Sequence, residues 1–229
     1  MVSVSSDPAQ PVPIEYGVWD IPIVPAASLE PQSAALRNTL LAAQRRLTAF
    51  ALKHDWRTHV QEPFARLFHV YADKASFDHD LLELCGLDPA MELPATYCAA
   101  LEQGVLMSVS AELYRALYPQ GDEEGAFEKL LAHEMAHRLQ IRILGGDEKA
   151  MGAVWFYEGF ALEAAGQFEK TAPHLTAAEI WDVVSAEERG DYRRYASVFR
   201  HFLGKASIQQ LVEMAGKSGF VEWLKEISV

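Results

Sequence analysis

Two histidines stand four positions apart in residues 129–140, KLLAHEMAHRLQ, and a glutamate directly follows the first. On a helix this spacing puts His133 and His137 one turn apart on nearly the same face, so both rings can bind one metal ion. Glu134 lies about 100° around the helix from His133. It is therefore poorly placed as a third ligand but well placed to reach a water molecule on that ion. In this H-E-x-x-H pattern neutral imidazoles bind zinc and the carboxylate acts as general base.

A metal site of this kind needs a third ligand, and Glu158 in residues 154–166, VWFYEGFALEAAG, is the candidate. A carboxylate in such apolar surroundings is costly unless it is paired or bound to a cation. Glu163 is the rival, but it stands about 140° around the helix from Glu158, so the two cannot face the same ion. We expect Glu163 to point to solvent or to a partner of the ligands. The alternatives are a surface helix with two titrating histidines and a glutamate buried in a salt bridge.

Together the two segments resemble the gluzincin clan of zinc peptidases, the group of thermolysin and aminopeptidase N. In that clan a second helix supplies a glutamate from a W-x-x-E-G-x-A segment, and Trp155, Glu158, Gly159 and Ala161 match it position for position. The stretch 138–157 between the second histidine and this glutamate is one or two residues longer than in those two enzymes. The resemblance covers roughly two thirds of the chain, from the first expected strand to the end of the expected helix at 207–215.

The resemblance implies a fold and a reaction. The fold is α+β and zincin-like, with a small mixed sheet lobe, a helical lobe after it and the metal cleft between them. The reaction is hydrolysis of a peptide bond by water activated on one Zn²⁺ ion, which His133, His137 and Glu158 hold, with Glu134 as general base. Three protein ligands leave the fourth position of zinc open, as in catalytic sites. Thermolysin has an aspartate four residues after its glutamate ligand to hold a histidine ring; Leu162 stands there in this chain, which leaves the partner of the histidines unassigned.

A tyrosine adds to the resemblance. In relatives of aminopeptidase N a tyrosine stands in a Y-x-K-G context before a helix, and its hydroxyl stabilises the oxyanion on the scissile carbonyl. Tyr192 in residues 191–203, DYRRYASVFRHFL, matches if Arg194 replaces the lysine and Tyr195 the glycine. Tyr195 is the alternative. For either ring, simple packing at the start of a helix is the competing interpretation.

A further similarity concerns residues 99–103, AALEQ, and the G-A-M-E-N segment by which aminopeptidases hold the amino terminus of a substrate. Glu102 would be that anchor. The competing interpretation is a plain hairpin turn at Glu102-Gln103-Gly104, which the neighbouring β-forming residues favour. We expect the strand near 104–109 to be an edge strand that aligns an extended peptide through main-chain hydrogen bonds.

These residues need a scaffold of helices around a small sheet. Apolar residues at helical spacing predict helices at about 31–56, 75–86, 122–143, 151–168, 176–187, 191–203, 207–215 and 218–227. We expect Asp122 to cap the helix that carries the two histidines. Alternating β-forming residues predict a strand at 64–73 and two more around the turn at Gly104.

The first 31 residues carry six of the eleven prolines, which favours a Pro-rich N-terminal arm. We expect Trp19, Ile21 and Ile23 to pack along the body of the protein. The predicted organisation is an arm over 1–31 and a single zincin-like domain over 32–229, with a sheet-containing lobe at about 32–120 and a helical lobe at about 121–229.

Composition limits the partners and the compartment. The chain has 229 residues and a formal net charge of −12, so neither nucleic acid nor an anionic membrane is expected as partner. Two cysteines are too few for a disulfide framework, although a single bridge stays open. The N-terminus lacks the pattern of a signal peptide, and no run of 18 apolar residues occurs, so we expect a cytoplasmic protein.

The sequence therefore predicts a zinc metallopeptidase that acts on a peptide or protein substrate. Two alternatives stay open: a catalytically silent module that binds zinc or a partner on the same fold, and a zinc hydrolase of a non-peptide bond. The net charge favours neutral or cationic substrates. The substrate sequence, internal against terminal cleavage, and the oligomeric state do not follow from the sequence.

Overall fold

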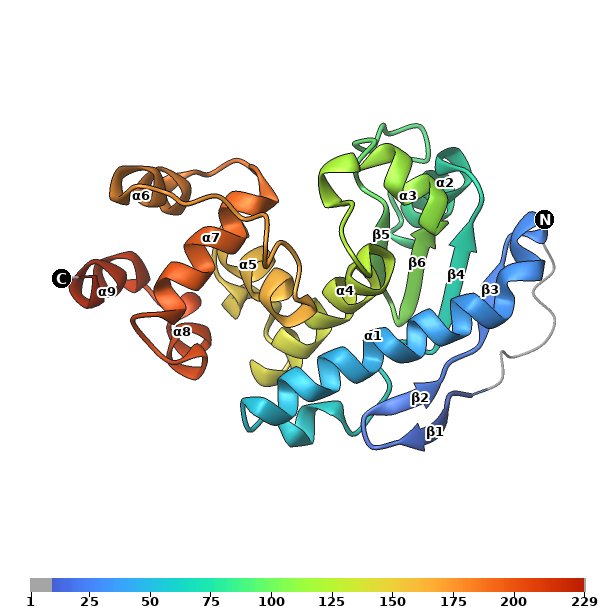
Figure 1. Cartoon of the computed structure of the whole chain (residues 1–229), viewed down its shortest axis with the longest axis horizontal. Helices are drawn as coiled ribbons and strands as arrows, with labels where there is room; N and C mark the ends of the chain where they lie inside the picture. Colours follow the sequence, from blue (N-terminus) through green and yellow to red (C-terminus); the bar gives the residue numbers. More distant parts are fainter. Residues whose placement is uncertain (1–9, 229) are drawn as a thin grey trace.

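The computed structural model describes residues 10–228, which combine helices with two small sheets. The helices are α1 (Ser33–Lys53), α2 (Lys74–Leu84), α3 (Ala111–Leu117), α4 (Ala126–Ile143), α5 (Val154–Ala165), α6 (Ala177–Ser185), α7 (Tyr192–Leu203), α8 (Ile208–Ala215) and α9 (Phe220–Ile227). The strands are β1 (Val12–Glu15), β2 (Val18–Asp20), β3 (Ile23–Pro25), β4 (Leu67–Tyr71), β5 (Ala99–Glu102) and β6 (Val105–Val109). The sheet strands β3 to β6 lie at one end of the molecule and α5 to α9 at the other, while α1 and α4 run between them (Figure 1).

The main sheet has the strand order β3-β4-β6-β5, in which β5 alone is antiparallel to its neighbour. The predicted edge strand near 104–109 is therefore wrong, because β6 pairs with β4 on one side and with β5 on the other. Every residue of β6 is buried, whereas β5 ends in the partly buried Leu101 and the exposed Glu102. A strand that is mostly apolar on both faces needs cover on both sides, which places β6 inside and β5 at the edge.

The hairpin between β5 and β6 closes with a two-residue turn. Gln103 and Gly104 both have positive φ angles, 49° and 77°, and Glu102 pairs with Val105. Consecutive positive φ angles are typical of the turn that matches the twist of paired strands. The hairpin-turn interpretation of this segment is confirmed.

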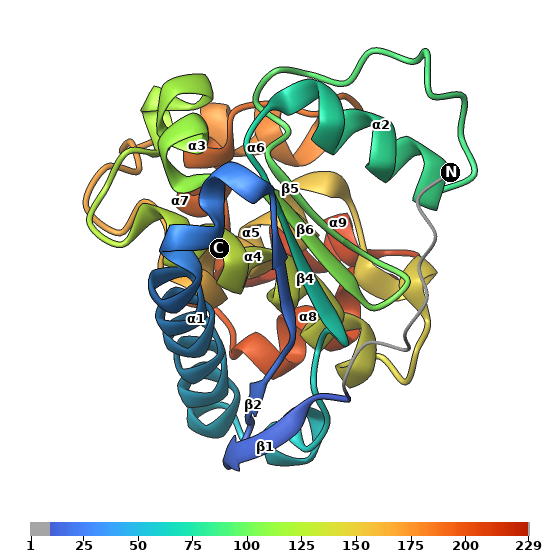
Figure 2. The same cartoon turned by 90° about the vertical axis from the view of Figure 1, so that its right-hand side faces the viewer.

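Two core clusters lie on opposite faces of the main sheet. Side chains alternate along a strand, so neighbouring residues of β4 and β6 enter different clusters. The larger cluster joins the sheet to α1, α4, α5 and α7 and contains Phe68, Val70 and Leu106. The smaller one joins it to α2 and α3 and contains Tyr71, Val105, Met107 and Val109. Figure 2 shows α1 and α2 on different sides of the sheet.

The described part of the N-terminal arm packs on the body, as predicted. Ile21 is buried in the larger core, and Trp19 and Ile23 pack against it. The side chain of Gln44 on α1 accepts a hydrogen bond from the Trp19 backbone at 3.0 Å. Strand β3 pairs in parallel with β4, so the main sheet takes one strand from the arm. Residues 1–9 of the arm lie outside the described residues.

Helix α4 occupies the centre of the molecule and packs against α1, α5 and β5. It begins after Gly125, whose φ of 70° is left-handed, and not at Asp122. The predicted cap is therefore wrong: the Asp122 carboxylate pairs with Arg115 at 3.2 Å. The reason is a tight turn in which Ala126 donates a hydrogen bond to the Glu123 carbonyl at 3.0 Å, which delays the start of the helix.

Across residues 10–228, no helix combines the length and the apolar character that crossing a membrane requires. Cys85 is exposed, Cys98 is buried, and both are free. The cytoplasmic location stays a prediction from the sequence.

Candidate metal centre

The two histidines of α4 lie side by side. Their Nε2 atoms are 3.1 Å apart, and the ring centroids are separated by 4.7 Å. His133 faces the core and is 5% exposed, whereas His137 is partly exposed. The two nitrogens therefore meet at the margin of the core, where solvent can reach one side of the pair.

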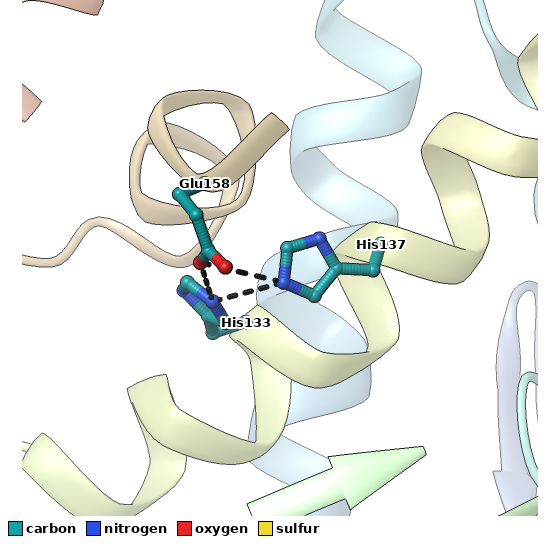
Figure 3. Close-up of side chains that lie close together, drawn as sticks. All are labelled: His133, His137 and Glu158. Atoms are coloured by element: carbon teal, nitrogen blue, oxygen red, sulfur yellow. Dashed lines mark hydrogen bonds and ion pairs between the residues drawn. The ribbon is translucent and has the colours of Figure 1, made fainter. Parts of the chain in front are cut away.

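Helix α5 brings the carboxylate of Glu158 to the same point (Figure 3). Its Oε2 lies 3.0 Å from Nε2 of His133 and 3.6 Å from Nε2 of His137. Glu158 itself is only 2% exposed. Gly159 permits this placement, because a Cβ there would lie 2.7 Å from the Cβ of Phe199 on α7. Close packing of α5 on α7 thus holds the glutamate next to α4.

The three donor atoms have the spacing that a tetrahedral zinc ion requires. Their separations are 3.0, 3.1 and 3.6 Å. With zinc–ligand bonds of about 2.0–2.1 Å, tetrahedral ligands stand about 3.3 Å apart. Two histidines and one glutamate are also a donor set of catalytic zinc sites. The residues fit a single divalent ion.

Gln167 fixes the orientation of the first histidine. Its Oε1 lies 2.9 Å from Nδ1 of His133, and both side chains are buried. When Nδ1 carries the proton and donates it to this oxygen, the lone pair of Nε2 faces Glu158. Such a partner on the far ring nitrogen is the usual support of a metal-binding histidine. Gln167 therefore takes the place that the sequence left unassigned.

The turn after α5 that carries Gln167 is itself held by Arg200. The guanidinium donates to Glu163 Oε2 at 2.8 Å, to the Gln167 carbonyl at 2.7 Å and to the Phe168 carbonyl at 2.9 Å. Phe168 has a left-handed φ of 54°, which a bulky residue adopts only when its surroundings hold it there. Glu163 thus points away from the histidines and supports the backbone of their partner.

The electrostatics of the cluster favour a cation between the three donors. Burial opposes ionisation of Glu158, but the hydrogen bond with His133 and the nearby positive charges lower its pKa to about 2. Burial also opposes a charge on His133, yet its contact with Glu158 raises the pKa of that ring overall. Burial lowers the pKa of His137 to about 4. The carboxylate therefore stays ionised and attracts positive charge, while His137 stays neutral, as a metal ligand must be.

Glu134 lies next to this cluster with a pKa raised to about 7. Burial is the main cause. The negative charges of Glu158 and Glu102 raise this pKa further, while the positive charges of His133 and Arg189 lower it. A carboxyl group in this range can both accept and release a proton near neutral pH. This is the property that a general base needs.

The structure separates the two candidate tyrosines. Tyr192 is the first residue of α7, and its ring centroid lies 6.1 Å from that of His133. Tyr195 is buried, and its hydroxyl accepts a hydrogen bond from the backbone of Gly190. Of the two, Tyr192 alone presents its ring to the metal ligands.

Arg189 belongs to the site although no pattern in the sequence marks it. It lies between α6 and α7, and its Nη1 donates to Glu158 Oε1 at 2.5 Å and also to the hydroxyl of Tyr192. Its Nη2 donates to the hydroxyl of Tyr157 at 3.1 Å. Only the folded chain brings these groups together, because a loop arginine has no characteristic spacing from its partners.

Tyr97 in the loop before β5 and Glu102 at the end of β5 lie on the sheet side of the site, where both interact with the charge of Glu134. Burial raises the pKa of Tyr97, and the charges of Glu134 and Glu102 raise it further. Burial also raises the pKa of Glu102. Both groups are thus close enough to α4 to interact with its charged side chains. The role of Glu102 as an anchor for a substrate amino group stays a prediction.

Two cavities in residues 10–228 lie away from the three ligands. One of 480 Å³ is between residues 58–62 and the C-terminal half of α4, and one of 280 Å³ is beside the start of α4. A second group of side chains that could bind a metal, His79, Asp80 and Glu83, is exposed on α2. The cleft expected between the two lobes stays a prediction.

No protein-family model, curated protein or solved structure matches this chain. The resemblance to the gluzincin clan is therefore a prediction carried by the residues around His133 and Glu158. The function has to be argued from the chemistry of the site.

Proposed function

We propose that the chain is a zinc-dependent peptidase with a zincin-like fold of the gluzincin type. The observation that carries the proposal is the convergence of His133, His137 and Glu158, from two helices, at the spacing of tetrahedral zinc ligands. One side of the group is accessible to solvent, and a carboxyl group with a pKa of about 7 stands beside it. A purely structural zinc site has no use for that carboxyl group.

In the proposed reaction each residue has one task. His133, His137 and Glu158 would hold a zinc ion, which as a Lewis acid would lower the pKa of water to roughly 7 and polarise a carbonyl group. Glu134 accepts the proton of the attacking water and then delivers it to the leaving nitrogen. The hydroxyl of Tyr192 donates a hydrogen bond to the oxygen on which negative charge develops. The ligating atoms, Oε2 of Glu158 and Nε2 of each histidine, carry no proton throughout.

The edge of the sheet supports a peptide as substrate. Strand β5 packs against α4, and no strand in residues 10–228 pairs with its outer edge. Its free main-chain groups can pair with an extended peptide, a common mode of peptide recognition. A net charge of −12 favours neutral or cationic peptides and gives no reason to include nucleic acid or a membrane.

The test is Glu134→Gln, compared with wild type and with Glu148→Gln, which changes an exposed glutamate at the 3₁₀ turn before α5. Purified protein is analysed for metal and then incubated with a diverse peptide mixture that is read by mass spectrometry. We expect one zinc per chain in all three proteins. Loss of the general base should lower kcat about 10²–10⁴-fold in Glu134→Gln only.

Two results would redirect the proposal. Stoichiometric zinc with no cleavage of peptides by wild type points to a binding module or to hydrolysis of another bond, which a panel of esters and small amides separates. Equal turnover by wild type and Glu134→Gln rules out the assigned base.

A further inference from the structure

Arg189 contacts both halves of the proposed catalytic apparatus. One of its nitrogens, Nη1, donates to Oε1 of the metal ligand Glu158 and to the hydroxyl of Tyr192. The side chain is 48% exposed, whereas that of Glu158 is 3% exposed. Burial of apolar surface therefore does not explain why the arginine lies here. Its hydrogen bonds do.

We propose that Arg189 is a positioning residue that sets the metal ligand Glu158 and the oxyanion donor Tyr192 with a single guanidinium group. The inference rests on the proposed function and adds a residue that the resemblance does not supply. It joins α5 to α7 at the point where each helix delivers its functional side chain.

The first consequence concerns Glu158. Oε1 is occupied by the guanidinium, so Oε2 alone faces the two histidine nitrogens. Arg189 thus makes the carboxylate a ligand through one oxygen and fixes the direction of that oxygen. Hydrogen bonds to the second oxygen of a ligating carboxylate are a common way to tune metal affinity.

The second consequence concerns Tyr192. A phenol has one O–H donor, and its oxygen here accepts from Arg189, so the proton is left to point elsewhere. Burial and the charge of Glu158 raise the pKa of Tyr192, whereas the charge of Arg189 lowers it. The cation therefore polarises the O–H group towards donation. Tyr157 holds the other guanidinium nitrogen and restricts its rotation.

A simpler role would be neutralisation of a buried carboxylate. In that case any cation at position 189 would serve, and a bound metal ion would make the arginine dispensable. The positioning role differs in two respects: it requires the planar fork of arginine, and its effect on turnover persists when metal is saturating.

The test compares Arg189→Gln and Arg189→Lys with wild type. Arg193→Gln is the matched control, because within residues 10–228 the guanidinium of Arg193 pairs with Asp191 alone, at the start of α7. Zinc affinity is measured by competition with a chelator. The visible spectrum of the cobalt(II)-loaded proteins reports the coordination geometry, because tetrahedral cobalt absorbs more strongly than cobalt with more ligands. Circular dichroism checks that each variant is folded.

For Arg189→Gln we expect a zinc affinity lower by about 10- to 100-fold and a changed cobalt spectrum. At saturating zinc, kcat should fall by up to about 100-fold while KM stays constant. Arg189→Lys should recover part of the affinity but not kcat. In a double-mutant cycle at saturating zinc, Arg189→Gln should lower kcat only slightly in a Tyr192→Phe background, because the arginine acts on kcat through that hydroxyl.

Unchanged zinc affinity and cobalt spectrum in Arg189→Gln would overturn the proposal, and so would full recovery of kcat by lysine. If Arg189→Gln alters metal binding but wild type cleaves no peptide, the role of Arg189 towards Glu158 is supported. The proposed peptidase activity is then refuted. If wild type binds neither zinc nor cobalt, the role of Arg189 and the proposed function are both refuted.

Discussion

The two sides of the candidate site are built differently. On the helical side, formed by α5, the start of α7 and the loop before it, hydrogen bonds connect Glu158, Arg189 and Tyr192. On the sheet side, Tyr97 and Glu102 are each partly covered and partly in solvent, and within residues 10–228 neither side chain makes a hydrogen bond or ion pair. The helical side is thus fixed before any substrate binds, whereas the sheet side is free to adapt to one.

We infer from this difference that the helical side carries the reaction and that the sheet side recognises the substrate. Groups that bind a metal or stabilise a developing charge have to be held within a fraction of an ångström, which a network of hydrogen-bonded partners achieves. Groups that accept different side chains of a substrate need no such restraint. Substitutions on the helical side should therefore change metal affinity or kcat, and those on the sheet side should change KM.

The largest effect is expected from removal of the third ligand. Glu158→Ala leaves two histidines, so stoichiometric zinc binding and turnover should both be lost. Glu102→Ala, the matched change on the sheet side, should keep one zinc per chain and change KM alone. Metal analysis after dialysis, followed by peptide kinetics, checks both. Zinc loss in Glu102→Ala would remove the distinction between the two sides.

The next effect concerns the pair of tyrosines. Tyr192→Phe should keep its zinc and lose about 10²–10³-fold in kcat, because an oxyanion donor is missing. Tyr195→Phe removes the acceptor for the Gly190 backbone, so it should keep kcat and lose about 1 kcal/mol of stability. Steady-state kinetics and denaturant unfolding distinguish the two. A loss of kcat in Tyr195→Phe alone would reverse the assignment.

A smaller effect is expected at Gln167. Replacement by alanine removes the hydrogen bond to Nδ1 of His133 and should weaken zinc binding by about 10- to 100-fold. At saturating zinc most of the turnover should return. Competition with a graded series of chelators measures the affinity. Unaltered affinity would mean that His133 is oriented by packing alone.

The smallest effect on catalysis is expected from the titration of the two histidines in the metal-free protein, because it changes stability alone. His137, with a folded pKa of about 4 against 6.5 unfolded, binds a proton on unfolding, so stability falls as the pH drops from 6.5 towards 4. His133 has a raised pKa, so its contribution is complete below pH 6.5 and is lost as the pH rises through its folded pKa. The contribution of the two rings therefore peaks near pH 6.5.

His137→Gln should remove the acid side of this profile and leave the alkaline side. With chelator present, we expect the Tm of wild type to fall towards pH 4 by on the order of 6–12 °C more than that of the variant, because a shift of this size corresponds to roughly 3 kcal/mol. Thermal unfolding at a series of pH values measures it. Parallel profiles would show that the ring of His137 is not buried neutral.

The sequence predicted the elements that carry a periodic signal. Helical spacing indicated the helices that hold His133 and Glu158, and β-forming residues around a glycine indicated the hairpin of β5 and β6. Strand β3 was not predicted, because Pro22 precedes it and Pro25 is its last residue, and the prolines conceal the pattern. Its place in the sheet comes from pairing with β4, a contact distant in the sequence.

The same limit applies to the site. The spacing of the histidines and the apolar surroundings of Glu158 can be recognised within short stretches of the sequence. Gln167 and Arg189 do not, because each acts from a turn or loop whose course depends on tertiary contacts such as those of Arg200. The contacts of Gln167 and Arg189 with the site exist only in the folded structure. The proposed peptidase activity itself stays a prediction.

The central claim is that the two imidazoles and the carboxylate hold one zinc ion. Crystals of zinc-loaded protein, measured on both sides of the zinc absorption edge, test it most directly. The account predicts one anomalous peak per chain, about 2.0–2.2 Å from Nε2 of His133, Nε2 of His137 and Oε2 of Glu158. A peak elsewhere, or none at these three atoms, would contradict it.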